Sequence, residues 1–317
     1  MPKATGANSR IVVDTETTFK ADPGTPNGRV IPFLSCTLKA EQPLLSDESL
    51  TGSRNKSAPE LGQMSVAGDL VVNLCATAHS LLFRHLLGGV TTTGASDPYT
   101  HTLKVGTLPV GMVFNKEFTD INQYHKYNGC RVSGMSMEVK PDGFIATTFR
   151  FLGSKETVGG TAYDATPTSE AYDKFTGFHG TILEGGAAIA TVTNFKFDID
   201  NDLDPDVYVI GSAGEREELP EGSVLVKGSI EAFFEDDTLL AKARASTESS
   251  LKITLDKGVT PARSVELFIP ELRFKRTGPD ISGPKGIKTT LDFEGYYDNS
   301  TEASSIQVII KNGLTAL

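Results

Sequence analysis

The chain has 317 residues, of which 38% are hydrophobic and 22% charged, so it is long enough for two hydrophobic cores and too apolar for general disorder. Its 40 acidic and 30 basic residues give a net charge of −10, which repels phosphate and argues against a nucleic-acid-binding or anionic-membrane-binding protein. No segment has the length of a signal-peptide apolar core or a membrane helix, so we expect a cytosolic chain without a membrane anchor.

Alternation of apolar and polar residues dominates the sequence and predicts a mainly β protein, because successive side chains of a strand point to opposite faces. Two stretches have helical features instead. Residues 78–89 (AHSLLFRHLLGG) end on a Gly pair, and residues 236–246 (DDTLLAKARAS) begin with Asp and carry bases later. The polar stretch 153–173 lacks periodicity and is typical of a linker. The clearest strands are FKFDI (195–199), SVLVKGSIEAFF (223–234), SLKITL (250–255), VELFIPELRF (265–274) and IKTTLDFEGYY (287–297).

The two halves of the sequence repeat each other. IATTFRFLG (145–153) and IKTTLDFEG (287–295) share the pattern Ile-x-Thr-Thr-apolar-x-Phe-x-Gly. Upstream, GQMSVAGDLVVNL (62–74) aligns with GSVLVKGSIEAFF (222–234), and a predicted helix follows in both copies. The common order of elements predicts an internal duplication of one small β domain with a single helix.

Residues 195–206 (FKFDIDNDLDPD) contain five Asp and raise the question of a calcium loop, since hard oxygen ligands at alternate positions suit that ion. Counted from Asp198, the sixth position should turn sharply but is Leu203, and the twelfth should be Glu but is Val209. The aligned stretch 35–52 keeps the apolar residues and lacks the Asp cluster. A solvated strand end and turn is the preferred interpretation, and a weak divalent site stays open.

No pattern predicts catalysis or a structural metal. The His residues form no i, i+4 pair, and the sequence has no nucleophile elbow, phosphate loop or dinucleotide fingerprint. The Cys residues are odd in number, widely spaced and surrounded by apolar residues, so we expect buried thiols. We therefore assign no catalytic, cofactor-binding or metal-ligating residue, and a hydrolase with dispersed active-site residues is a minor alternative. The residues considered are His79, His85, His101, His125, His179, Cys36, Cys75 and Cys130.

Basic residues are dispersed, and their densest group lies in the Gly-Pro-rich loop 273–288. The corresponding turn of the first half is only KPDG (140–143), so the loop elaborates one copy. Two interpretations stay open, a solvated loop or an exposed hairpin that meets an acidic neighbour, such as another copy of this acidic chain.

The sequence resembles the tail tube proteins of long-tailed bacteriophages, in the form that carries two tube domains in one chain. The resemblance rests on the glycine-flanked strand and following helix of each half, on the strand that enters an Asn-Leu turn (FKFDIDNDL), and on the Thr-Thr strand near the close of each half. It covers roughly residues 30–298. It implies two tandem β-sandwich or barrel domains with one short α-helix each, and a structural protein without enzymatic activity or cofactor.

The resemblance implies that the chain joins copies of itself into rings, which stack into a tube that conducts DNA during ejection. A duplicated chain favours a trimeric ring with pseudo-sixfold symmetry, with a hexamer as the alternative. Tail terminator, tape measure and baseplate proteins are implied partners, and double-stranded DNA passes through without specific binding if the wall is poor in Lys and Arg. We expect assembly in the host bacterial cytoplasm and a final location in the virion tail.

These patterns divide the chain into an N-terminal arm (1–33), a first tube domain (34–154), a linker (155–177), a second tube domain (178–298) and a C-terminal segment (299–317). Arms that order on assembly and tie ring to ring are expected at residues 1–33, 104–130 and 275–286.

Two other functions stay open. A baseplate hub or the inner tube of a contractile injection device has the same lineage, and electron microscopy separates these from a long tube. A calcium-dependent β-sandwich adhesion or glycan-binding protein would be built around the Asp run, which calorimetry with calcium tests.

Overall fold

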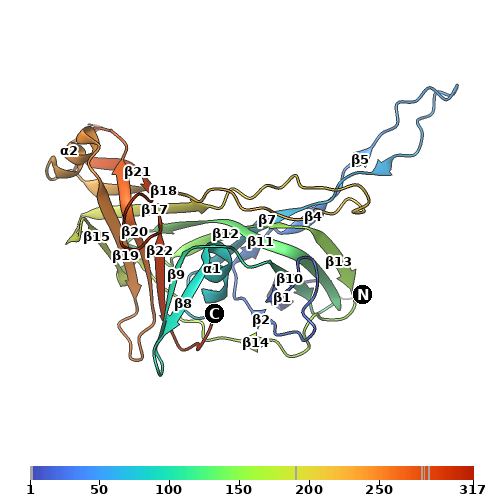
Figure 1. The fold of residues 1–317 in the computed structure, drawn as a ribbon, viewed down its shortest axis with the longest axis horizontal. Helices are drawn as coiled ribbons and strands as arrows, with labels where there is room; N and C mark the ends of the chain where they lie inside the picture. The colour runs from blue at the N-terminus through green and yellow to red at the C-terminus, as the bar shows by residue number, and fades with distance from the viewer. Residues whose placement is uncertain (1–2, 190, 280, 282, 285) are drawn as a thin grey trace.

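The computed structural model describes residues 3–189, 191–279, 281, 283–284 and 286–317. Within them the chain is mainly β, and its two α-helices are short, as predicted from 78–89 and 236–246: α1 spans Ser80–Leu87 and α2 spans Thr238–Ala245 (Figure 1). Two 3-10 turns, η1 (Gly6–Asn8) and η2 (Gly177–His179), precede strands. The strands are β1 (Ser9–Glu16), β2 (Arg29–Val30), β3 (Ser35–Cys36), β4 (Lys39–Glu41), β5 (Leu44–Leu45), β6 (Glu60–Leu61), β7 (Ser65–Asn73), β8 (Gly88–Thr93), β9 (Tyr99–Val105), β10 (Gly111–Phe118), β11 (Gln123–Val139), β12 (Ala146–Gly153), β13 (Lys155–Gly159), β14 (Thr168–Ser169), β15 (Gly180–Glu184), β16 (Ala187–Ala188), β17 (Val192–Asp200), β18 (Leu225–Phe233), β19 (Ser249–Asp256), β20 (Ser264–Phe274), β21 (Lys288–Tyr296) and β22 (Gln307–Asn312).

Each half of the chain follows the same order of antiparallel pairs. In the first half β1 pairs with β10, β10 with β11, β11 with β12, β12 with β7, and β7 with β3 and β4. In the second half β15 pairs with β19, β19 with β20, β20 with β21, β21 with β18, and β18 with β17. The register also agrees, because Gly68 lies opposite Phe151 and Gly228 lies opposite Phe293.

The register shift in the second pair of each half is equivalent too. The ladder between β10 and β11 shifts just before Phe114 meets Tyr127, and the ladder between β19 and β20 shifts just before Leu251 meets Ile269. Such β-bulges bend a strand and increase its twist, so both halves bend their longest strand at the same place.

The halves join edge to edge. The later part of β11, from Gly134 to Val139, pairs with β17 from Phe195 to Asp200, which makes one sheet continuous from β4 to β20. The buried apolar side chains of both halves form a single cluster, so the halves share a core. This sheet runs through the middle of the molecule in Figure 1.

Parts of the two stretches expected to be assembly arms, 1–33 and 104–130, form strands in the structure. Residues 9–16 form β1, and Ile11, Val12 and Val13 are fully buried against β10. Residues 111–118 form β10, which lies between β1 and β11. Strands buried on both faces have continuous apolar runs without alternation, and this is why the period-two pattern missed them.

The predicted linker 155–177 and the C-terminal segment 299–317 are also paired. Residues 155–159 form β13 on β11, and residues 168–169 form β14, which lies parallel to β2. The C-terminal strand β22 lies between β20 and β9, where it closes one side of the second half. No helix of the described residues has the length and apolar character to cross a membrane.

Candidate channel face and assembly edges

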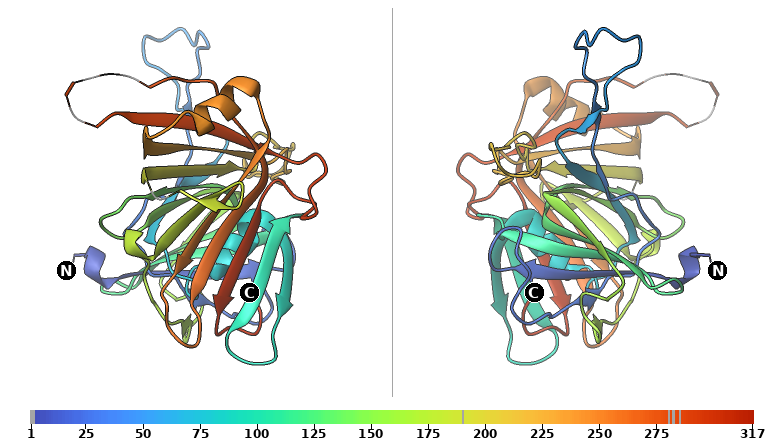
Figure 2. Two further views of the ribbon diagram at one scale, coloured as in Figure 1. Left: turned by 90° about the vertical axis from the view of Figure 1, so that its left-hand side faces the viewer. Right: turned by 90° about the vertical axis from the view of Figure 1, so that its right-hand side faces the viewer.

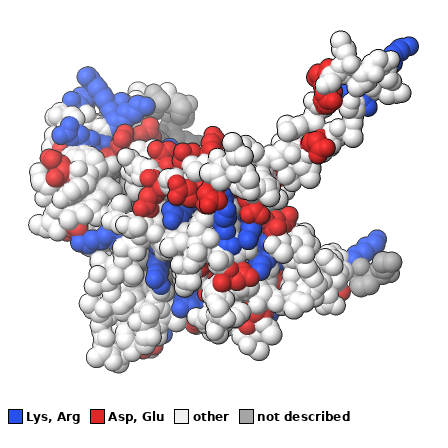
Figure 3. All heavy atoms as spheres, turned by 45° about the vertical axis from the view of Figure 1, so that its right-hand side comes forward, with Lys and Arg blue, Asp and Glu red and all other residues white. Residues whose placement is uncertain are grey.

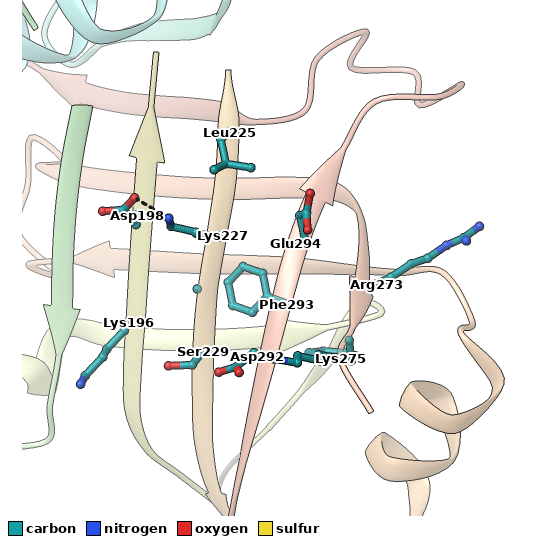
Figure 4. A pocket seen from close by; sticks show the side chains of 12 residues that line it. Lys196, Asp198, Leu225, Lys227, Ser229, Arg273, Lys275, Asp292, Phe293 and Glu294 are labelled. Atoms are coloured by element: carbon teal, nitrogen blue, oxygen red, sulfur yellow. Dashed lines mark ion pairs between the residues drawn. The ribbon is translucent and has the colours of Figure 1, made fainter. Parts of the chain in front are cut away.

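The continuous sheet has one apolar and one polar face, because its strands alternate. On β17, Phe195, Phe197 and Ile199 point into the core, whereas Lys196 and Asp198 lie on the opposite, polar face (Figure 4). The same alternation on β18 and β21 extends this face, where a shallow hollow of about 630 Å³ lies over the strands. The hollow is lined in part by Lys196, Asp198, Lys227, Arg273, Asp292 and Glu294.

Several basic side chains of the polar face have acidic partners. A cation that is already paired with a carboxylate of the sheet is less available to a phosphate. The hydrogen bond from Lys288 lowers the pKa of Glu231, which keeps that partner ionised. The pairs are Arg150 with Asp198 (2.8 Å) and Asp200 (3.5 Å), Lys227 with Asp198 (3.9 Å), Lys196 with Glu138 (3.8 Å) and Lys288 with Glu231 (2.7 Å).

The Asp run is a strand end followed by turns, as preferred from the sequence. Asp198 and Asp200 end β17, and the amide of Asp202 donates to Asp200 Oδ1 at 2.9 Å. The amide of Asp206 donates to Asp204 Oδ1 at 3.0 Å in a second turn of the same kind. Among the residues that the structure describes, no group of three or more His, Cys, Asp or Glu is placed to hold a metal ion.

Most of the His and Cys residues are buried. His79 Nδ1 accepts the amide hydrogen of Cys75, so its Nε2 donates to the carbonyl of Pro32, and burial lowers the pKa of His79 to about 4. His85 and Thr15 meet at 3.0 Å in the core. The expectation of buried thiols is confirmed for Cys75 and Cys130, and Cys36 is half-buried.

The continuous sheet has an open edge at its β4 end, and the chain leaves the sheet after β20 at the other end. Among the described residues β3 and β4 pair only with β7, so their outer edge is free. At the other end, residues 275–279 continue β20 outside any strand, and they belong to the basic loop predicted at 273–288. The predicted arm 275–286 lies in this loop, and residues 280, 282 and 285 fall outside the described part. Free edges carry unpaired backbone groups that favour pairing with another chain.

Two long connections extend from equivalent places in the halves. Residues 42–63, between β4 and β7, project from the body with the short β5–β6 ladder near their base (Figures 1 and 2). Leu44, Leu45 and Leu61 are each more than half exposed, and Leu50 is fully exposed. Residues 201–222, between β17 and β18, instead run back over the first half, where Tyr208 donates to the carbonyl of Met64 at 2.9 Å.

Arg216 fastens the 201–222 connection to the first half, and nothing in the sequence indicated this role. Its side chain is buried and donates to the carbonyls of Val66 (2.9 Å) and Gly153 (2.7 Å) at the ends of β7 and β12. It also donates to Pro205 O (2.6 Å) and Ser65 Oγ (2.9 Å). Its charge is thus met by the dipoles of three carbonyls and one hydroxyl.

A free sheet edge, a projecting connection with exposed Leu residues and a polar sheet face are features of a building block of a larger assembly. Figure 3 shows acidic residues gathered across the middle of this molecule with basic residues beside them. A family model described as phage tail tube protein matches residues 6–295. The chain therefore belongs to the phage tail tube protein family, which makes it a structural protein of the tail tube and not an enzyme. Among curated proteins none matches the chain.

Proposed function

We propose that this protein assembles head to tail into closed rings, which stack to form the tube through which phage DNA leaves the capsid. The observation that carries the proposal is the ladder between β11 and β17, in which one half of the chain already pairs with the other through sheet edges. A second contact of the same kind joins successive chains. Because each chain supplies two equivalent halves, three chains are enough to close a ring with pseudo-sixfold symmetry.

An internal duplication explains why the contact repeats. The matched order of strand pairs, the matched bulges and the Gly–Phe positions all support two copies of one unit. On this proposal the first copy runs from β1 to β12 and the second from β15 to β21, so residues 9–16 belong to the first copy and not to an arm.

The proposed ring contact has a definite register. Residues that lie opposite equivalent partners are themselves equivalent, so Val132, opposite Phe151, matches Phe274, opposite Phe293. The β11 strand has a bulge between Val132 and Gly134, and on the proposal that the second half keeps this bulge, Gly134 matches Arg276. By the same argument Ile199 matches Ala40, which makes Asp200 equivalent to Glu41. Gly134 lies opposite Asp200 within the chain. The repeated contact therefore sets Arg276 of one chain opposite Glu41 of the next, a pair of opposite charges.

The projecting connection 42–63 has an equivalent function. Its counterpart, 201–222, lies on the first half, with which β17 is paired. By the same arrangement, 42–63 would lie on the second half of the neighbouring chain whose edge pairs with β4. This location would cover the exposed Leu44, Leu45, Leu50 and Leu61.

The polar face of the sheet lines the channel in this proposal. The wall would then contain basic residues, which differs from the expectation of a wall poor in Lys and Arg. Pairing of Arg150, Lys196, Lys227 and Lys288 with carboxylates would limit DNA binding. Assembly takes place in the host cytoplasm, and tail terminator, tape measure and baseplate proteins are the partners at the ends and inside of the tube.

Electron microscopy of the purified protein at high concentration tests the proposal. We expect open rings or long tubes of one diameter, with three chains per ring. Short rings that never stack would favour a hub protein, and a permanently monomeric chain would overturn the proposal.

A further inference from the structure

The segment just before the second half is anchored on the first half. Phe175 is fully buried, its amide donates to the carbonyl of Leu74 at 3.0 Å, and its carbonyl accepts the amide hydrogen of Ile145 at 3.1 Å. Bridges on either side pair Cys75 with Lys174 and Phe144 with Thr176. This segment thus covers the place where β7 ends and β12 begins.

The N-terminal residues repeat this segment in sequence and in shape. Lys3-Ala4-Thr5-Gly6 corresponds to Lys174-Phe175-Thr176-Gly177, with three of the four residues identical. Each tetrapeptide leads into a 3-10 turn and then into the equivalent strands β1 and β15. The capping residues Thr5 and Thr176 have φ, ψ of −122°, 141° and −121°, 166°, and in both turns the amide after the turn donates to the carbonyl of its Gly.

Both segments also contact the same turn of their own half. Thr5 donates through its amide to Asp120, in the turn between β10 and β11, at 2.8 Å. Lys257, just after β19, donates to the carbonyl of Lys174 at 3.3 Å. The N-terminal segment therefore has the same location relative to the first half as residues 174–177 have relative to the second.

The second half has the receiving site, and no described residue occupies it. The amide of Phe234 donates to Ile287 O at 2.9 Å, as the amide of Leu74 donates to Ile145 O at 2.9 Å. Leu74 is fully buried, but Phe234 is 38% exposed and Phe233 is 45% exposed. Among the described residues the Phe234 carbonyl and the Ile287 amide make no backbone hydrogen bond, and a hollow of about 420 Å³ lies beside them under α2.

We propose that residues 3–6 of one copy dock on the second half of its neighbour, at Phe234 and Ile287, as residues 174–177 dock on the first half within a chain. This inference rests on the proposed ring. The amide of Ala4 donates to Phe234 O, the amide of Ile287 donates to Ala4 O, and Lys3 lies opposite Glu235, the equivalent of Cys75. The N-terminal segment and the β4 edge lie at the same end of the molecule (Figure 1). The contact that joins two chains through β4 therefore also brings the N-terminal segment to the second half of the neighbour.

Engineered cysteines test the docking in the assembled protein. Opposite residues of an antiparallel pair have Cβ atoms about 4.5–5.5 Å apart, close to the span of a disulfide. In a Cys36→Ser background, Lys3→Cys with Glu235→Cys is expected to form disulfides between chains on mild oxidation, read as dimers and trimers on a non-reducing gel. Lys174→Cys beside the native Cys75 is the positive control, with an intrachain disulfide detected by mass spectrometry.

A matched negative control separates docking from random contact. Lys3→Cys with Asp256→Cys keeps the number of thiols and moves one to an exposed end of β19 on the side that faces its own first half. Rings in which the positive control reacts but the Lys3–Glu235 pair links no more than this control would overturn the docking and leave the ring proposal intact. A chain that never assembles would overturn both.

Discussion

Removing the buried Arg216 guanidinium should release the 201–222 connection from the first half. The side chain makes four hydrogen bonds, to two strand-end carbonyls, one loop carbonyl and one hydroxyl. Bonds to a charged donor contribute about 1.5–3 kcal/mol each, but the buried charge itself costs several kcal/mol that its removal recovers. We therefore expect Arg216→Ala to lower the free energy of unfolding by about 3 kcal/mol, and Arg216→Lys by roughly half of that.

Urea unfolding followed by far-UV circular dichroism measures this change, since the chain has no Trp. Arg54→Ala, on the exposed connection 42–63, is the matched control and should change stability by less than about 0.5 kcal/mol. A local readout is proteolysis at Ile210, which is fully exposed on the connection and should be cut faster once the guanidinium is gone. An Arg216→Ala variant as stable as the Arg54→Ala control, with unchanged proteolysis, would refute the reasoning.

Three further changes test other parts of the account. Burial holds the pKa of His79 at about 4, below its usual value, so the neutral side chain contributes stability above pH 6.5. This contribution, about 3 kcal/mol in total, is lost as pH falls toward 4. Urea unfolding at several pH values should therefore show a flatter pH dependence of stability for His79→Gln than for the parent. Gly228→Ala would place a Cβ against a strand backbone and a Phe ring, and it should lower the free energy of unfolding by about 2 kcal/mol in urea. Gly159 has open space around the position of a Cβ, so Gly159→Ala should leave the stability unchanged. Equal effects of the two substitutions would contradict this packing. Glu41→Arg or Arg276→Glu should weaken assembly in sedimentation velocity, and the double reversal should restore it unless the proposed register is wrong.

The second half of the fold was predictable from its pattern. Its predicted strands alternate because one face of each packs on the core and the other is polar. Each prediction overlaps a strand of the structure: 195–199, 223–234, 250–255, 265–274 and 287–297. The two helices were predictable for a similar local reason, because their ends carry the residues that helix termini favour.

Long-range pairing was not predictable in the same way. Period-two alternation gives the buried face of a strand but not its partner, so the ladder between β11 and β17 left no local signal. Apolar residues were also ambiguous, because Ile11 is in the core whereas Leu50 is fully exposed on an arm. In the proposed ring a neighbouring chain would cover side chains of the second kind.

The central claim is that successive chains repeat the contact between β11 and β17. A cryo-EM reconstruction of the assembled tube tests it most directly, because strand pairing and register are visible there. The account predicts that β4 of each chain pairs with residues 276–279 of its neighbour, with Glu41 opposite Arg276. A tube in which the outer edge of β4 stays unpaired, or pairs with another segment, would contradict it.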